Sequence, residues 1–374
     1  MRINKSKATF SSIVGIGQKV KKAAKDTGKE YLELNRGVNS VVGIDLTNIK
    51  DKIDFNSKEF QLYAPNLGIE SLRNSIFKEY FPTYYNDNKT DIINNISITP
   101  GGMPALDLII QTLDVNFWFP RFYWGSYSKM ATIRNKSFSF YDSLSDIDLN
   151  YIDSNDCIFI CDPNNPTGMK MDDTDLIKAI QDIVSVGATV VFDSPYRKLF
   201  NIDQKMNYSI YEKIMHKNVI ITESFSKWIG LPGVRLGFIY SNNKDLNDEL
   251  NIRLLYEFNG ISSPSQIIVN TLLSTDEGLQ AIKEFQTVTT EHIEKNIQYL
   301  KDNNLLVDEV YNGSMPMGIF AIINRSEDYL FQHQIGAVGL DKFVFMNKDN
   351  WSSYSRICVS VNHELFVSFM SKVI

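Results

Sequence analysis

The chain is poor in the residues that usually hold metals or form disulfides. Among its 374 residues there are three cysteines and four histidines, namely Cys157, Cys161 and Cys358, and His216, His292, His333 and His363. An odd number of cysteines provides no paired framework, and the histidines show no metal-ligand spacing. We therefore expect no metal site, free buried thiols and a reducing, cytoplasmic location.

Long apolar runs and an excess of positive charge are also absent. No apolar run approaches the roughly 18–20 residues that a membrane helix requires, so we expect no membrane partner. The net charge of −6 argues against nucleic acid as the main partner. Before residue 30 the chain is lysine-rich, which suggests either a solvated helix over residues 12–27, the interpretation that we favour, or an amphipathic transit peptide.

Length and composition indicate a globular protein with more than one domain. A chain of 374 residues is long for a single core, and 43% apolar and 22% charged residues are ordinary values. We expect two domains, with a smaller second sheet in the C-terminal part of the chain.

Residues 218–240, NVIITESFSKWIGLPGVRLGFIY, contain the most informative stretch of the chain. The apolar run at 219–221 predicts a buried strand, which would place Lys227 just beyond the carboxyl end of that strand, where open α/β sheets bind ligands. Ser224, Ser226 and Arg235 supply hydroxyl groups and a positive fork suited to a phosphate dianion. A lysine beside a phosphate clamp suggests an aldehyde cofactor that carries a phosphate.

The segment SFSKWIGLPGVRLGF resembles the cofactor-lysine motif of fold-type I pyridoxal-phosphate enzymes, the aspartate aminotransferase superfamily (class I/II aminotransferases). The resemblance covers nearly the whole chain. It implies an α/β fold with a three-layer large domain around a mostly parallel sheet, and a small α/β domain from both termini. The implied boundaries are 46–270 for the large domain, and 1–45 with 271–374 for the small one. Pyridoxal 5'-phosphate is the implied cofactor, held by Lys227 as a Schiff base.

Two further motifs of that family concern the cofactor phosphate. The strand, glycine turn and helix predicted in ISITPGGMPALDLIIQTL form a ready anion site, with the backbone amides of Gly102 and Met103 as donors. The segment YAPNLGIESLR resembles a motif whose tyrosine, here Tyr63, reaches the phosphate of the neighbouring subunit. Tyr63 thereby implies a homodimer, although an ordinary turn before a helix over residues 69–79 would explain the same pattern.

The cofactor ring has its own matched positions. In FWFPRFYWGSY, the family places one ring after the proline to stack on the pyridine; Phe122 matches best, with Tyr123 as a close competitor. Asn165 in NPTG and Tyr196 in DSPY would hydrogen-bond the phenolic oxygen. Asp193 would pair with the pyridine nitrogen and keep it protonated, although Ser194 replaces the glutamate usual in the family.

Two positions are implied for the substrate. Gly37 matches the glycine of a loop that covers the substrate, although the Pro-Asp pair usual in the family is missing. Arg356, ahead of a short apolar strand, matches the arginine that clamps the substrate α-carboxylate. In the same C-terminal part of the chain, the pattern predicts a helix at about 277–303 and strands within 306–323 and 343–347.

The implied function is aminotransfer from an L-amino acid to a 2-oxo acid. The same residues also serve C–S β-lyases and amino-acid decarboxylases of this fold, so a lyase remains the alternative. A third class, a non-enzymatic regulator with a DNA-binding head, is disfavoured by the acidic composition and by the absence of a helix-turn-helix pattern before residue 30.

Overall fold

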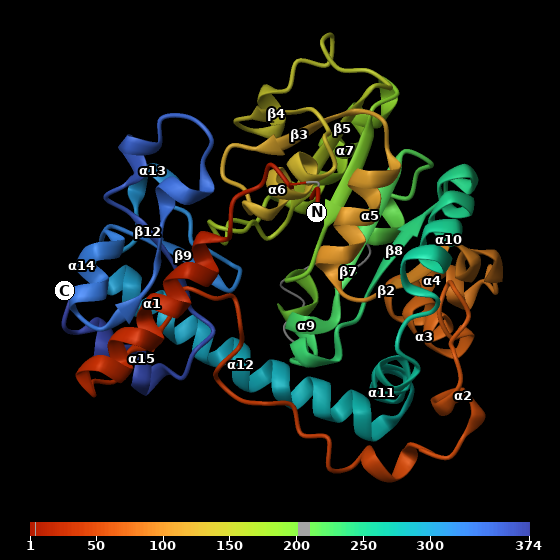
Figure 1. The fold of residues 1–374 in the computed structure, drawn as a ribbon, viewed down its shortest axis with the longest axis horizontal. Helices are drawn as coiled ribbons and strands as arrows, with labels where there is room; N and C mark the ends of the chain where they lie inside the picture. Colours follow the sequence, from red (N-terminus) through yellow and green to blue (C-terminus); the bar gives the residue numbers. More distant parts are fainter. Residues whose placement is uncertain (4, 201–209) are drawn as a thin grey trace.

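The computed structural model of the protein describes residues 1–3, 5–200 and 210–374. Its main sheet has seven strands in the order β2-β8-β7-β6-β5-β3-β4 (Figure 1). Strand β8 runs antiparallel to both of its neighbours, and the remaining pairs are parallel. The strands are β2 (Ile96–Thr99), β3 (Asn116–Pro120), β4 (Phe138–Tyr141), β5 (Asp156–Cys161), β6 (Thr189–Asp193), β7 (Val219–Ser224) and β8 (Gly237–Ser241). The mostly parallel sheet predicted from the sequence is confirmed.

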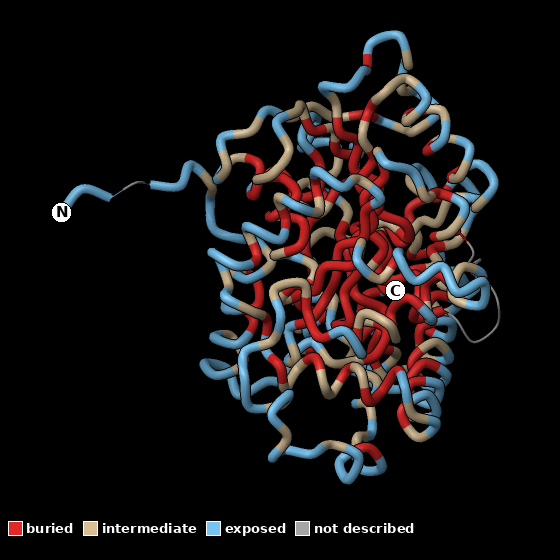
Figure 2. The backbone as a smooth tube through the Cα atoms, turned by 90° about the vertical axis from the view of Figure 1, so that its right-hand side faces the viewer, coloured by how far each residue is buried: buried red, intermediate tan, exposed pale blue. Residues whose placement is uncertain are grey.

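The central strands of this sheet are almost completely buried. Every residue of β7 and β8 is buried, as are all but the first residues of β5 and β6. Continuous apolar runs of this kind are typical of parallel strands that helices cover, and the buried chain forms a continuous centre in Figure 2. The helices in this part are α2 (Lys58–Gln61), α3 (Glu70–Tyr80), α4 (Pro82–Asn86), α5 (Gly102–Thr112), α6 (Ser126–Ile133), α7 (Asp173–Ser185), α8 (Ile210–Lys213), α9 (Phe225–Trp228), α10 (Lys244–Phe258) and α11 (Ser263–Ser274).

A second, smaller part combines a segment from the N-terminal region, beginning with α1, with the C-terminal part of the chain. Its strands are β9 (Phe320–Ile323), β11 (Val338–Gly339) and β12 (Ser355–Cys358), which form an antiparallel sheet in the order β11-β12-β9, and β1 (Leu32–Glu33) and β10 (Ile335–Gly336), which pair in parallel. Its helices are α1 (Ser12–Thr27), α13 (Asp308–Tyr311), α14 (Glu327–Gln332) and α15 (His363–Met370). The pairing of β1 with β10 brings the N-terminal segment to the C-terminal one, as the resemblance implies.

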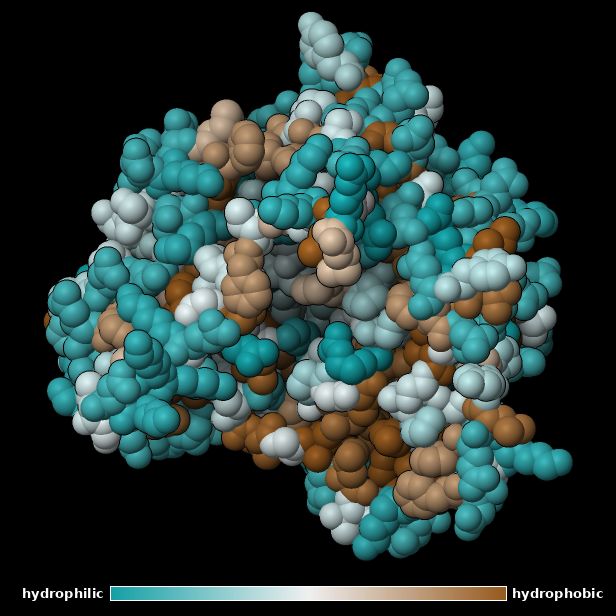
Figure 3. Space-filling model, viewed as in Figure 1, coloured by the Kyte–Doolittle hydropathy of each residue, from teal (hydrophilic) through white to brown (hydrophobic). Residues whose placement is uncertain are grey.

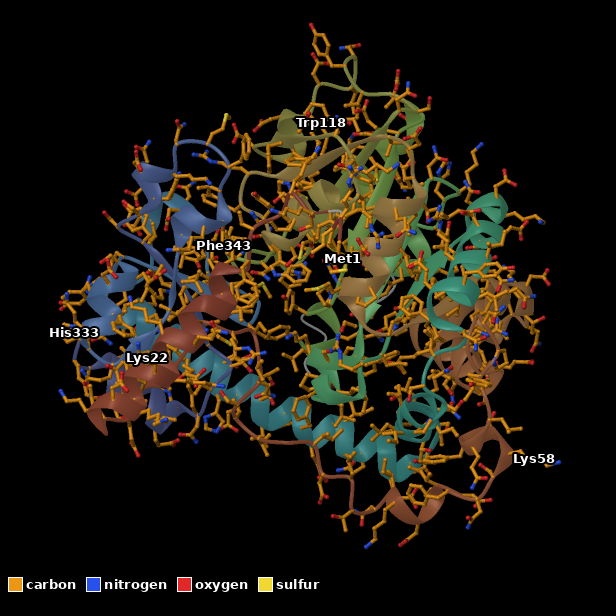
Figure 4. The ribbon with its side chains drawn as sticks, viewed as in Figure 1. Met1, Lys22, Lys58, Trp118, His333 and Phe343 are labelled. Atoms are coloured by element: carbon orange, nitrogen blue, oxygen red, sulfur yellow. The ribbon has the colours of Figure 1, made fainter. Side chains whose placement is uncertain are left out.

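One long helix and one long segment connect the two parts. Helix α12 (Asp276–Asp302) runs along the base of the molecule, and the chain after α1 returns along the same base toward α2 (Figure 1). In Figure 4, Lys22 and His333 lie on one side of the molecule and Lys58 lies on the other. The boundaries at 46 and 271 stay predictions.

The secondary structure predicted for the C-terminal part was correct for the helix and partly wrong for the strands. The helix expected at 277–303 is α12. Within 306–323, the main strand is β9, while 308–311 form a helical turn, and residues 343–347 form no strand. Phe343 and Val344 of this apolar run are buried, whereas Phe345 and Met346 are exposed. Two side chains can pack against neighbouring elements without the backbone forming a strand. Within the described residues, no helix is both long and apolar enough to cross a membrane.

Candidate active site

A pocket of about 410 Å³ lies where the carboxyl ends of β5, β6 and β7 meet the start of α5 and the small sheet. Parallel strands end together at one edge, so side chains far apart in the sequence converge there. The residues predicted for the site that line this pocket are Gly37, Gly102, Met103, Asn165, Asp193, Tyr196, Ser224, Ser226, Lys227, Arg235 and Arg356. Phe122 and Tyr63 are the two predicted residues that do not.

Lys227 lies in α9, the single helical turn that follows β7. Ser224 caps this turn, with its hydroxyl oxygen accepting a hydrogen bond from the backbone N–H of Ser226 at 3.3 Å. Removal from water lowers the pKa of Lys227 to about 8, and the nearby guanidinium groups of Arg356, Arg36 and Arg235 act in the same direction. At pH 7 roughly a tenth of the amine is then neutral, far more than in a free lysine, and the neutral amine is the form that acts as a nucleophile or base.

Four residues, Gly101, Gly102, Ser224 and Arg235, lie together at the N-terminus of α5 and form a cradle suited to a phosphate group. Gly101 has φ 108°, and a Cβ atom at this position would lie 2.7 Å from Nη2 of Arg235. A Cβ atom at Gly102 would lie 3.1 Å from Cβ of Ser224. The cradle thus depends on glycine, opens at the N-terminus of α5, and contains a guanidinium whose Nη1 donates to the carbonyl of Pro232 at 2.9 Å. These residues fit the phosphate of the implied cofactor.

Asp193 ends β6 at the base of the pocket and is 5% exposed. The hydroxyl of Tyr127 donates a hydrogen bond to its Oδ2, and the hydroxyl of Thr222 donates to its Oδ1 at 3.2 Å. Burial raises the pKa of Asp193 to about 6, against the effect of these two hydrogen bonds. A buried carboxylate gains most from a cationic partner, so this position suits the protonated ring nitrogen of the cofactor.

Asn165, Tyr196 and Arg356 form one connected group on the other side of the pocket. Nδ2 of Asn165 donates to the hydroxyl oxygen of Tyr196 at 3.2 Å, and Nη1 of Arg356 donates to Oδ1 of Asn165 at 3.1 Å. Nη2 of Arg356 donates to the backbone carbonyl of Asn35. The side chains of Asn165 and Tyr196 are thus available to the phenolic oxygen of the implied cofactor, and the guanidinium of Arg356 lies beside them.

Arg356 is almost fully buried, yet it has no carboxylate partner among the residues that the structure describes. Its guanidinium lies 4.3 Å from the ring centroid of Phe320 and 4.7 Å from that of Phe343. Its buried Nε has no hydrogen-bond partner, and burial lowers the pKa of Arg356 to about 10. An unpaired buried cation is costly, so this site is prepared for an anion such as an α-carboxylate.

Phe122, the residue expected to stack on the cofactor ring, does not line this pocket. It lines a neighbouring cavity with Met169 and Val310, and its ring packs edge-on against Trp351 at 5.0 Å. Tyr123, the competitor, is buried against Phe119 and Phe140. Trp124 lines the pocket instead. Successive residues of the loop between β3 and α6 point to different sides, so the order after Pro120 does not determine which ring faces the pocket.

Other residues of the pocket were missed by the sequence analysis. Tyr127 and Arg36 line the pocket. Behind the lining, Thr222 donates to Asp193 together with Tyr127, and the carbonyl of Asn35 accepts from Arg356. The motifs contain no signal for them, except that Tyr127 lies in the aromatic cluster. Tyr63 lies outside the pocket and is 85% exposed. The described residues contain no cluster of metal-ligating side chains.

The sequence is similar to a known protein family and to curated aminotransferases. The sequence profile of the family "Aminotransferase class I and II" matches residues 29–332. The chain is 28% identical over 218 residues to the chloroplastic LL-diaminopimelate aminotransferase of Arabidopsis thaliana (56% of this chain, 41% of the relative). It is 25% identical over 235 residues to a histidinol-phosphate aminotransferase of Methanosphaera stadtmanae (60% of this chain, 58% of the relative). The matches thus span about half the length of these relatives.

The whole fold resembles solved structures. The aspartate aminotransferase of Thermus thermophilus with maleate superposes with a TM-score of 0.83, covering 100% of this chain and 99% of that chain at 16% identity. The similarity extends to BacF of Bacillus subtilis, with a TM-score of 0.80 at 19% identity. At such identities the likeness concerns the fold and not the substrate.

Proposed function

This chain belongs to the aminotransferase class I and II family, whose members use pyridoxal phosphate, and we propose that it moves an amino group from an L-amino acid to a 2-oxo acid. The observation that supports this most strongly is the shared pocket of Lys227 and Arg356. Lys227, with a pKa of about 8, and the buried guanidinium of Arg356, which has no carboxylate partner among the described residues, line the same cavity. Gly102, Ser224 and Arg235, which are suited to a phosphate, line it as well. One site can therefore hold the cofactor and an intact amino acid.

Each residue has a role that follows from its position. Gly102, Met103, Ser224, Ser226 and Arg235 would hold the phosphate, and Asp193 the ring nitrogen, with Trp124 on the ring face in place of Phe122. When bound, the cofactor supplies the electron sink that makes the substrate Cα–H acidic. Asn165 and Tyr196 would hold the phenolic oxygen through their polar groups.

The substrate is bound and deprotonated by two residues. Arg356 would bind the α-carboxylate through its free donors, which orients Cα toward Lys227. The neutral amine of Lys227 then accepts the proton from Cα, since a base with a pKa near the working pH transfers protons most effectively. The carbonyl of Gly37 accepts a hydrogen bond from Nζ of Lys227, which places the N-terminal segment beside this amine.

A PLP-dependent C–S β-lyase or another amino-acid lyase of the same fold is the second candidate. A carboxylate clamp, a base and an electron sink serve both reactions, so the same residues support it. The two functions differ in where the amino group ends. In aminotransfer it stays on the protein-bound cofactor, whereas a lyase releases ammonia.

The visible spectrum of the protein loaded with pyridoxal phosphate, recorded while single L-amino acids are added without a keto acid, tests the proposal. Aminotransfer predicts a stoichiometric spectral change with one keto acid released per site. Catalytic release of pyruvate and ammonia with a persistent band would indicate a lyase. No response to any amino acid, together with no cofactor binding, would refute both.

We further propose a cytoplasmic homodimer in which Tyr63 reaches the cofactor phosphate of the neighbouring subunit. The support is an exposed apolar area at the base of the molecule, seen below the centre in Figure 3. Phe55, Leu62 and Tyr63 are exposed, and the hydroxyl of Ser263 at the start of α11 holds the carbonyl of Leu62 at 2.7 Å. Exposed apolar side chains of this kind are typical of interaction surfaces. The buried free thiols of Cys157, Cys161 and Cys358 suit a reducing compartment.

A further inference from the structure

Arg36 lies between the two backbone carbonyls that contact the central cations of the pocket. The carbonyl of Asn35 accepts from Nη2 of Arg356, and the carbonyl of Gly37 accepts from Nζ of Lys227. Arg36 itself lines the same pocket, and its charge contributes to the lowered pKa of Lys227. Its side chain is exposed, which places it at the open end of the cavity rather than at its base.

The lining of the pocket contains more positively charged than negatively charged side chains. Its lining contains the cations Arg36, Lys227, Arg235 and Arg356, and Asp193 is its only carboxylate among the described residues. The proposed function assigns Arg235 to a phosphate and Arg356 to the α-carboxylate, while Lys227 serves as a neutral amine. Within the described part of the chain, the guanidinium of Arg36 has no ion-pair partner, so one positive charge remains for a further anion.

The wall next to Arg36 is suited to a short aliphatic chain. Ile13 and Val14, from the first turn of α1, line the pocket with Arg36. Nδ2 of Asn35 donates to the carbonyl of Ile13 at 3.1 Å, which ties this turn to the Arg36 segment. A substrate anchored at Arg356 and Lys227 would extend its side chain toward the mouth, along apolar groups that end at a guanidinium.

We propose that Arg36 binds the distal anionic group of the substrate, so that amino acids with an acidic side chain are preferred over neutral ones of the same length. This inference rests on the proposed function. A guanidinium fork matches a carboxylate and a phosphate monoester equally well, so the shared chemistry is a terminal oxyanion two or three bonds beyond Cβ.

The test compares L-glutamate with L-glutamine, which has the same size without the charge. In the loaded protein, the rate of the spectral change gives kcat/KM for each amino acid and for O-phospho-L-serine. We expect the glutamate to glutamine ratio to fall on the order of 10–100-fold in Arg36→Gln, because a charged hydrogen bond loses its partner, and to recover partly in Arg36→Lys. A larger rate with O-phospho-L-serine than with glutamate would identify the anion as a phosphate monoester.

A matched control is Arg121→Gln, since Arg121 is an exposed arginine that pairs with Asp142 outside the pocket. It should leave the ratio unchanged. The inference is overturned if the wild-type protein shows no preference for glutamate over glutamine. It is also overturned if Arg36→Gln lowers kcat/KM for both amino acids by the same factor, in which case Arg36 belongs to the α-carboxylate clamp.

Binding of unreactive acids separates this inference from the proposed function. Calorimetry with glutarate and with valerate requires no turnover, so it reports on Arg36 even if no amino acid reacts. We expect glutarate to bind the wild-type protein more tightly than valerate, and the difference to vanish in Arg36→Gln. Equal affinities of the two acids for the wild-type protein would contradict the role of Arg36, whatever the reaction.

Discussion

The amine of Lys227 donates a hydrogen bond to the backbone carbonyl of Gly37, 190 positions earlier in the chain. This contact joins the lysine turn of the large sheet to the N-terminal segment of the small part. A Cβ atom at Gly37 would lie 2.4 Å from a ring carbon of Phe320, so the carbonyl approaches the amine only because residue 37 is glycine. Gly37 therefore shapes the site through its backbone.

Replacing Lys227 with alanine should abolish the visible absorbance that the protein acquires when it is loaded with pyridoxal phosphate. The amine is the reactive nitrogen of the pocket, and alanine removes it without adding volume. Lys129→Ala, at an exposed position outside the pocket, should keep the band. A retained band in Lys227→Ala would assign the cofactor to another lysine.

Asp193→Asn should remove the part of the pH dependence of the unfolding free energy that comes from Asp193, in the protein prepared without cofactor. The folded-state pKa of about 6 lies above the ordinary aspartate pKa of 3.8. The stabilisation that comes from the neutral form is therefore fully present below pH 3.8 and is lost as the pH rises through 6. Two pKa units correspond to roughly 3 kcal/mol, and asparagine mimics the neutral form at every pH.

Urea unfolding at several pH values between 4 and 7 measures this effect. The stability of the wild-type protein should fall relative to that of Asp193→Asn across this interval. Parallel curves would mean that Asp193 is ionised in the folded protein throughout the interval.

Trp124→Leu should weaken cofactor binding, whereas Phe122→Leu should not. The indole lines the pocket, while the ring of Phe122 packs on Trp351 in the neighbouring cavity. An aromatic stacking contact is worth about 0.5–1.5 kcal/mol beyond buried area, so the dissociation constant of pyridoxal phosphate should rise by about 2–13-fold. Fluorescence titration of the two variants checks this, and the reverse result would restore the original prediction of Phe122.

Arg356→Gln should raise KM for acidic and neutral amino acids alike, because every substrate loses its α-carboxylate partner. The expected cost is about 2–5 kcal/mol, as for the loss of one partner of a buried charged hydrogen bond. The absorbance of the loaded protein should persist, which would show that the pocket still folds. An unchanged KM would place the carboxylate elsewhere.

Tyr63 can be tested by mixing two inactive variants. If Tyr63 acts across a dimer interface, heterodimers of Tyr63→Ala and Lys227→Ala contain one complete site, and mixing should restore part of the activity. If Tyr63 acts within its own chain, mixing restores nothing. Light scattering on each variant confirms that both form dimers.

The local patterns predicted much of the site because each functional side chain follows a buried strand. Asn165 follows β5, Asp193 ends β6 and Lys227 follows β7, and strands of one parallel sheet end at the same edge. Apolar runs and the residues after them are local properties. For the same reason α12 was predicted nearly to its ends.

Side-chain direction in loops is not a local property. Phe122, Tyr123 and Trp124 are adjacent aromatic residues, and which of them faces the pocket depends on how the loop lies between β3, α6 and Trp351. The same holds for residues 343–347, which are apolar enough for a strand but have no neighbouring strand to pair with among the described residues.

The sequence by itself determined the buried strands that end at the pocket, the lysine turn and the glycine turn before α5, because these depend on residue type and on spacing along the chain. The tertiary structure decided which groups meet across long distances in the chain. It brought Tyr127 to Asp193, Asn35 to Arg356, and Arg36 to the mouth of the pocket. Tyr127 and Asp193 both belong to the large part, and Asn35 and Arg356 both belong to the small one. The members of each pair are far apart in the chain, so only the folding of the chain brings them within hydrogen-bond distance.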